Sequence, residues 1–212
     1  MSQRMIYQTE ETRAHILAVA ERLFLERGFF DTQMKDVAEA VGMSRNTLYR
    51  YYRDKTDLGV AILESVLAEV VGDFLAALQE SEQKPWPDRR AQLVAVLRAV
   101  VIEQKHETQL RYIAEFDAFF SGNRIPDNFA NLQDQTPWEP VIAAFSALIE
   151  AGIEEGSIRD DLPPDVLLQL LFLTTKSVQT ELTLRRPALR LWDPRMLPGL
   201  IDLLAQGLKP PA

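Results

Sequence analysis

Residues 42–55, GMSRNTLYRYYRDK, bring together side chains that could hold a nucleic acid. This segment contains three arginines, one lysine and three tyrosines, within a chain of 212 residues and formal net charge -8. Arg and Asn side chains match the hydrogen-bonding edges of guanine and adenine in the DNA major groove, and cationic and hydroxyl groups suit phosphate oxygens. A basic segment in an acidic chain therefore indicates a polyanion contact confined to one part of the molecule.

The spacing of these residues predicts which of them face outward. At about 100° per residue, a helix that begins at Arg45 places Arg45, Asn46 and Tyr49 within one arc of about 100°. Leu48 lies near 300° on the same helix, outside that arc, and can contact an apolar core. We therefore expect a polar reading face with an apolar anchor behind it.

Two short helices around a glycine turn must position this face. Thr32 is expected to cap the first helix and Gly42 to end it, because hydroxyls favour helix starts and glycine favours helix ends. Ser44 is expected to cap the second helix. A longer amphipathic helix over residues 9–27 precedes them. This order is typical of a helix-turn-helix, whose second helix enters the major groove.

Residues 12–58 resemble the DNA-binding domain of the TetR family of bacterial transcriptional regulators. The resemblance rests on a long helix, a Gly-aromatic pair, VAEAVGMS, TLYRYYRDK and an Asp/Leu helix start, in that order. It implies an all-α fold with an N-terminal three-helix helix-turn-helix DNA-binding domain over residues 1–55. A helical bundle for ligand binding and dimerisation would follow over residues 56–212. Past residue 60 the resemblance extends only to the general layout of the family.

The resemblance implies a role for each matching position. Arg45 and Asn46 correspond to the principal base-contact positions, and Lys35 to a position that approaches DNA from the first helix of the motif. Thr47, Tyr49 and Tyr51 match backbone-contact positions, and Lys55 matches a lysine that grips a phosphate. The expected DNA-binding set is Lys35, Ser44, Arg45, Asn46, Thr47, Tyr49, Tyr51 and Lys55, with capping as the main task of Ser44.

Residues 54–57 predict the start of the next helix. Asp54 and Asp57 form a plausible cap pair, which places Lys55 among free backbone N–H groups that attract anions. Tyr52 stands where the family more often has Phe, so we assign it to packing at the edge of the domain, with a hydroxyl that needs a partner. One long, one-sided helix is expected over residues 56–80.

The remainder of the chain is expected to bind a small-molecule effector and to form the homodimer. The resemblance implies a dimer interface built from the last two helices. Glu115 and Asp117 interrupt an aromatic run, where they either face water or select a cationic ligand. Core packing is the alternative role for the aromatic residues that could line a ligand cavity. These candidates are Trp86, Tyr112, Phe116, Phe119, Phe120 and Trp138.

Enzyme chemistry has little support in the sequence. The chain has no cysteine and two histidines. Glu103 and His106 have the Glu-x-x-His spacing of di-iron bundles, but that site needs a second copy, and His15 has Thr12 three residues before it. No Gly-rich phosphate loop is present. We therefore expect no enzymatic activity, no catalytic residue, no cofactor and no metal.

The sequence as a whole predicts a ligand-responsive transcriptional regulator, and specifically a repressor. It would bind a palindromic double-stranded DNA operator as a homodimer and be released by a small molecule. The chain shows no signal-peptide pattern and no apolar run near the roughly 20 residues of a membrane span, so we expect a cytoplasmic protein with no membrane contact. The alternative is a helical protein-interaction module that has no DNA target and uses its basic segment on an acidic protein.

Overall fold

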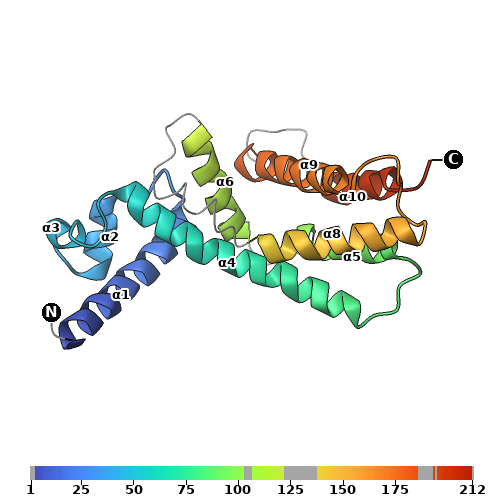
Figure 1. Ribbon diagram of the computed structural model, residues 1–212. Helices are drawn as coiled ribbons and strands as arrows, with labels where there is room; N and C mark the ends of the chain where they lie inside the picture. The colour runs from blue at the N-terminus through green and yellow to red at the C-terminus, as the bar shows by residue number, and fades with distance from the viewer. Residues whose placement is uncertain (1–2, 103–106, 122–137, 186–192, 194, 212) are drawn as a thin grey trace. The chain divides into compact units, whose positions relative to one another are not determined.

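The computed structural model describes residues 3–102, 107–121, 138–185, 193 and 195–211. All regular secondary structure within these residues is α-helical (Figure 1), which confirms the predicted all-α class. The helices are α1 (Gln3–Arg27), α2 (Met34–Val41), α3 (Arg45–Leu48), α4 (Lys55–Glu82), α5 (Arg89–Val101), α6 (Glu107–Ser121), α8 (Glu139–Glu154), α9 (Pro164–Arg185) and α10 (Met196–Gly207). None of the described helices is both long and apolar enough to cross a membrane.

The helices pack into two compact units. Unit 1 consists of the described residues of Met1–Leu67 and Thr108–Gln135, and unit 2 of those of Ala68–Glu107 and Thr136–Ala212. Helix α4 therefore contributes its first part to unit 1 and its second part to unit 2. The domain boundary after Lys55 stays a prediction, because a packing unit need not coincide with a functional domain.

Unit 1 has one apolar core, which holds the short helices in place. The apolar face of α1 packs against α2, α3 and the first part of α4, as its three- and four-residue spacing predicts. Helix α6 adds Tyr112 and Phe116, both fully buried, to the same core. The largest side chains buried in this core are Ile16, Phe24, Phe29, Leu48, Tyr52, Leu58, Ile62, Tyr112 and Phe116.

Unit 2 is a helical bundle made of the second part of α4 with α5, α8, α9 and α10. Its core includes Leu93, Phe145, Ile149 and Ile201, all fully buried. These side chains come from α5, α8 and α10, so burying them together joins the helices into one bundle.

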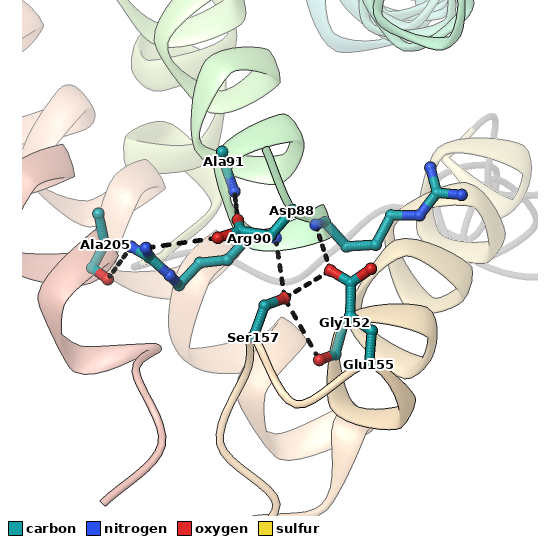
Figure 2. Close-up of polar contacts among 8 residues, drawn as sticks. Asp88, Arg90, Ala91, Gly152, Glu155, Ser157 and Ala205 are labelled. Carbon is teal, nitrogen blue, oxygen red and sulfur yellow. Dashed lines mark hydrogen bonds and ion pairs between the residues drawn. The ribbon is translucent and has the colours of Figure 1, made fainter. Parts of the chain in front are cut away.

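A polar network fixes the start of α5 within unit 2 (Figure 2). The Asp88 carboxylate accepts a hydrogen bond from the Ala91 N–H at 2.7 Å. The Glu155 carboxylate accepts from the Arg89 N–H, and the Ser157 hydroxyl accepts from the Arg90 N–H at 3.3 Å. Side chains thus occupy three of the N–H groups that a helix start leaves without partners inside the helix.

Arginines secure the other end of this network at α10. Arg90 donates to the Ala205 carbonyl at 3.3 Å, and Arg159 donates to the Gly207 carbonyl at 3.0 Å. Cations are favourable at a helix C-terminus, where the last carbonyls lack partners within the helix. The chain end at α10 is therefore held to α5 and to the turn after α8.

Candidate nucleic-acid interface

Helix α3 begins at a serine cap. The Ser44 hydroxyl accepts a hydrogen bond from the Thr47 N–H at 3.1 Å and lies 2.9 Å from the Thr47 hydroxyl. Gly42, with φ of 76°, ends α2 in the left-handed conformation that glycine adopts without steric strain. Both predictions for this turn are confirmed.

The prediction that Thr32 caps α2 is wrong. The N-cap is Gln33, whose N–H donates to the Asp36 carboxylate at 2.9 Å. The Thr32 hydroxyl is buried and donates instead to the Gly28 carbonyl at 2.9 Å, where α1 ends. Thr32 thus secures the exit from α1, and the acidic residue in the first turn of α2 supports the start of that helix.

The side chains of α3 divide into an outward and an inward face, as the periodicity predicts. Arg45, Asn46 and Tyr49 are exposed. Leu48 is fully buried in the core of unit 1, where it packs with Val37 and other apolar side chains. Burial of a leucine stabilises a fold by about 1.5–3 kcal/mol, so Leu48 anchors α3 while the three polar residues remain accessible.

The remaining expected DNA contacts lie around this face of unit 1. Lys35 on α2 is exposed, and Ser44 at the start of α3 is exposed as well. Thr47 and Tyr51 are half-buried, and the Tyr51 carbonyl accepts a hydrogen bond from Arg13 at 3.2 Å. Their contacts with DNA stay predictions.

Lys55 is the first residue of α4, as expected, and Asp54 caps that helix by accepting from the Asp57 N–H at 2.8 Å. The Lys55 ammonium donates to the Phe30 carbonyl at 3.1 Å and lies 4.6 Å from the centroid of the Phe29 ring. Burial lowers the pKa of Lys55 below its usual value. A phosphate would share this ammonium with the carbonyl or displace it, so the phosphate role of Lys55 stays a prediction.

Tyr52 packs inside unit 1 and is almost fully buried. The Arg13 guanidinium carbon lies 4.6 Å from the ring centroid, which is within cation–π range. Burial raises the pKa of Tyr52. No hydrogen bond to its hydroxyl is found within the described part of the chain. The hydrogen-bond partner that we expected for this hydroxyl is therefore not among the described residues.

Three residues of helix α6 make four polar contacts, which sequence reasoning missed, with the reading head, defined as α1, α2, α3 and the first part of α4. Arg111 donates to the Leu25 and Glu26 carbonyls at the end of α1, the latter at 3.2 Å. The Glu115 carboxylate accepts from the Phe29 N–H at 2.5 Å, and the Tyr112 hydroxyl donates to the Gly59 carbonyl at 2.8 Å. These contacts join residues at least 53 positions apart, so no local pattern predicts them. Glu115 is thereby engaged within unit 1.

Gly28→Ala is expected to destabilise unit 1 by about 2–4 kcal/mol, from left-handed strain and a clash together. Gly28 has φ of 93°, and an added Cβ would meet a Glu115 carboxylate oxygen at 2.6 Å. Gly42→Ala is the matched control, because its φ is 76° and nothing lies within 4 Å of an added Cβ. Urea unfolding should show a larger loss for Gly28→Ala. Equal losses would mean that the Glu115 carboxylate, at the far end of a flexible side chain, moves aside at little cost.

The candidate ligand residues that the structure describes belong to two different units. Tyr112, Phe116 and Phe119 belong to unit 1, where Phe119 packs 5.0 Å from Phe29 between ring centroids. In unit 2, the Trp86 indole donates to the Ser81 carbonyl at 2.7 Å. Trp138 packs against Phe74 with ring centroids 5.2 Å apart. The side chain of Phe120 lies outside the described residues, as do Glu103 and His106.

The N-terminal part of the chain matches a family model described as bacterial regulatory proteins, tetR family, over residues 16–62. Residues 16–62 thus match the N-terminal region of TetR-family proteins. The match begins within α1, includes α2 and α3, and ends in the first part of α4. It therefore includes most of the buried residues of the unit 1 core and the exposed residues Arg45 and Asn46.

Named relatives that resemble this chain are regulators of transcription. It is 34% identical over 107 residues to the HTH-type transcriptional regulator TtgR of Pseudomonas putida, and this alignment covers 50% of each chain. It is 27% identical over 164 residues to the HTH-type transcriptional repressor KstR2 of Rhodococcus jostii, covering 76% of this chain and 74% of the repressor. The chain thus spans about half the length of relatives such as TtgR.

Solved structures extend the likeness in fold to nearly the whole chain. A TetR-family transcriptional regulator from Pectobacterium atrosepticum has a TM-score of 0.67 at 22% identity, covering 99% of this chain and 98% of that one. The reduced form of NemR from E. coli has a TM-score of 0.63 at 21% identity, covering 95% and 99%. The family fold therefore extends over unit 2 as well.

Proposed function

We propose that this protein is a ligand-responsive transcriptional regulator of the TetR family, most simply a repressor, which binds a palindromic operator as a homodimer. The observation that carries the proposal is the exposed face of α3, where Arg45, Asn46 and Tyr49 stand over the buried anchor Leu48. Arg and Asn can each form paired hydrogen bonds with a base edge. Lys35, Thr47 and Tyr51 would then position α3 through phosphates.

Dimerisation through the last helices is supported by the exposed apolar side chains of unit 2. The large hydrophobic residues that are exposed there lie on α8, α9 and α10. Leu173 and Leu203 are 62% and 73% exposed, although burying a leucine side chain away from water is favourable. A second copy of this surface would cover them, and its two-fold symmetry would present two α3 helices to a near-palindromic site. The exposed set is Ile142, Leu170, Leu173, Met196 and Leu203.

Release by an effector is proposed as a population shift. An effector that binds unit 2 better in the DNA-free arrangement of the dimer lowers DNA affinity by the same coupling free energy. Helix α4 is continuous from the reading head into unit 2. Arg111, Tyr112 and Glu115 of α6 form hydrogen bonds with the reading head. These elements are the candidates for transmitting the change.

The test is binding to duplex DNA as a function of salt, followed by a footprint. A dimeric regulator should protect two half-sites about one helical turn apart, and its affinity should fall steeply as salt rises. A protein that ignores duplex DNA but binds acidic proteins would instead be an interaction module. A cytoplasmic location is part of the proposal.

Lys55→Ala should weaken binding to every duplex to a similar degree and lower the salt slope by about 1 per protomer, since one phosphate contact is lost. Lys84→Ala, which removes an exposed lysine paired with Glu80 in unit 2, is the matched control and should change neither quantity. Fluorescence anisotropy at several salt concentrations measures both. An unchanged slope for Lys55→Ala would mean that its ammonium keeps its contact with the Phe30 carbonyl on DNA.

A further inference from the structure

Four aromatic rings meet within unit 2. Phe74 of α4 packs edge-on against Trp138 at 5.2 Å and lies nearly parallel to Phe172 of α9, at 6.4 Å and an angle of 23° between ring planes. Phe145 of α8 contacts Phe172 at 5.3 Å. Phe145 is fully buried, whereas Phe74, Trp138 and Phe172 each keep part of their surface exposed. One ring of the cluster is therefore buried, and the other three are partly accessible.

Thr175 lies three residues after Phe172 on α9, and its hydroxyl has no hydrogen-bond partner among the residues that the structure describes. Its side chain is 7% exposed, and its oxygen is buried. In a helix, residues 168, 171, 172 and 175 share one face, and the three apolar members of this set pack in the unit 2 core. Thr175 therefore faces the core that contains the four rings.

The unpaired hydroxyl is unusual for two reasons. A threonine in a helix can donate to the carbonyl four residues earlier, and this hydroxyl does not. The other buried polar side chains described in unit 2 are paired, because the Ser81 hydroxyl donates to the Leu78 carbonyl at 2.7 Å and accepts from Gln92 at 3.0 Å. A buried polar group without a partner costs free energy that a bound molecule can recover.

The buried polar side chains of unit 2 favour an uncharged molecule. The buried polar side chains described in unit 2 are Ser81, Gln92 and Thr175, all of them neutral. An ion placed beside them would lose its hydration without gaining an opposite charge. Aromatic rings, by contrast, favour stacked or edge-on contact with another ring.

We propose that Phe74, Trp138, Phe145, Phe172 and Thr175 form the effector site, and that the effector is an uncharged aromatic molecule with one hydrogen-bonding group. This inference rests on the proposed function, in which an effector binds unit 2. The cation suggested by Glu115 is not part of it, since that carboxylate is bound to the Phe29 N–H in unit 1.

Three naphthalenes of similar shape test the site. By calorimetry, 2-naphthol should bind about tenfold more tightly than naphthalene, because it adds one neutral hydrogen bond. The anion 2-naphthoate should bind at least tenfold more weakly than 2-naphthol. Equal or tighter binding of 2-naphthoate, or no binding of any of the three, would overturn the proposal.

Thr175→Val should reduce the affinity for 2-naphthol to that for naphthalene, while Thr175→Ser should keep the preference. The matched control is Thr108→Val, because Thr108 lines a separate hollow of about 320 Å³ in unit 1, together with Glu21, Arg22 and Glu26. A preference that is lost in Thr108→Val and kept in Thr175→Val would locate binding in that hollow and contradict the proposal.

The ligand-free protein gives an independent readout. Thr175→Val replaces an unpaired hydroxyl with a methyl group of similar size, so its Tm should rise by about 2–4 °C. A lower Tm would mean that the hydroxyl is paired in solution, and would overturn the inference.

Binding of wild-type protein to its operator is measured alongside. Selective binding of 2-naphthol by a protein that ignores DNA would support the site and contradict the proposed function, whereas operator binding without that selectivity would contradict the site alone.

Discussion

Arg45→Ala is expected to weaken binding to the preferred operator by about 2–6 kcal/mol, because a dimer loses two base contacts of about 1–3 kcal/mol each. Arg45 is exposed at the first position of α3, and Leu48 remains buried behind it, so the substitution leaves the fold of the motif intact. Affinity for unrelated duplexes should fall much less, because phosphate contacts carry that binding. Anisotropy titrations on the operator and on a scrambled duplex measure the two affinities.

Arg45→Lys provides the matched control for this substitution. Lysine keeps the positive charge but lacks the planar fork that donates two parallel hydrogen bonds. Base discrimination should therefore fall in Arg45→Lys, with a smaller loss on the scrambled duplex than in Arg45→Ala. An equal loss on every sequence in Arg45→Ala would identify Arg45 as a phosphate contact and remove it from the base-reading set.

Leu203→Glu is expected to raise the dimer dissociation constant by a factor on the order of 10² to 10⁴. Two copies of a leucine worth about 1.5–3 kcal/mol each are lost, and two carboxylates are placed at the interface. Leu203 on α10 is 73% exposed, so the substitution should leave the monomer folded. Sedimentation velocity measures the dimer, and circular dichroism checks the fold.

Ala76→Glu adds the same charge at an exposed position of α4 and serves as the control for Leu203→Glu. The control should stay dimeric and keep its operator affinity. Leu203→Glu should lose operator affinity in proportion to the loss of dimer. A dimer of unchanged stability in Leu203→Glu would exclude α10 from the interface.

The reading head could be predicted from sequence because its geometry is local. The positions of Arg45, Asn46 and Leu48 follow from helical periodicity, a serine cap and a glycine stop, all within eight residues. The cap of α2 was misassigned because Thr32 and Gln33 are adjacent candidates. The acidic Asp36, three residues after Gln33, was the available signal.

The contacts of α6 and the aromatic cluster of unit 2 could not be predicted in the same way. Glu115 meets Phe29 across 86 positions of the chain, so its role depends on tertiary packing. For the aromatic residues, helical spacing shows that a face is apolar but not which unit it joins. Thr175 carried a weak signal, since it interrupts the otherwise apolar face of Leu168, Leu171 and Phe172.

If α3 reads a DNA sequence, the protein should select its sites from a pool of random DNA duplexes. The selection is carried out at about 150 mM salt, because nonspecific binding is weakened there. Wild-type protein and Arg45→Ala are carried through the same rounds and the retained DNA is sequenced. Wild-type protein should enrich a near-palindrome, and Arg45→Ala should lose preference at one base pair in each half-site. The selection is repeated after the protein is unfolded and refolded to remove any bound effector. If folded, dimeric wild-type protein enriches no sequence in either selection, α3 does not read DNA.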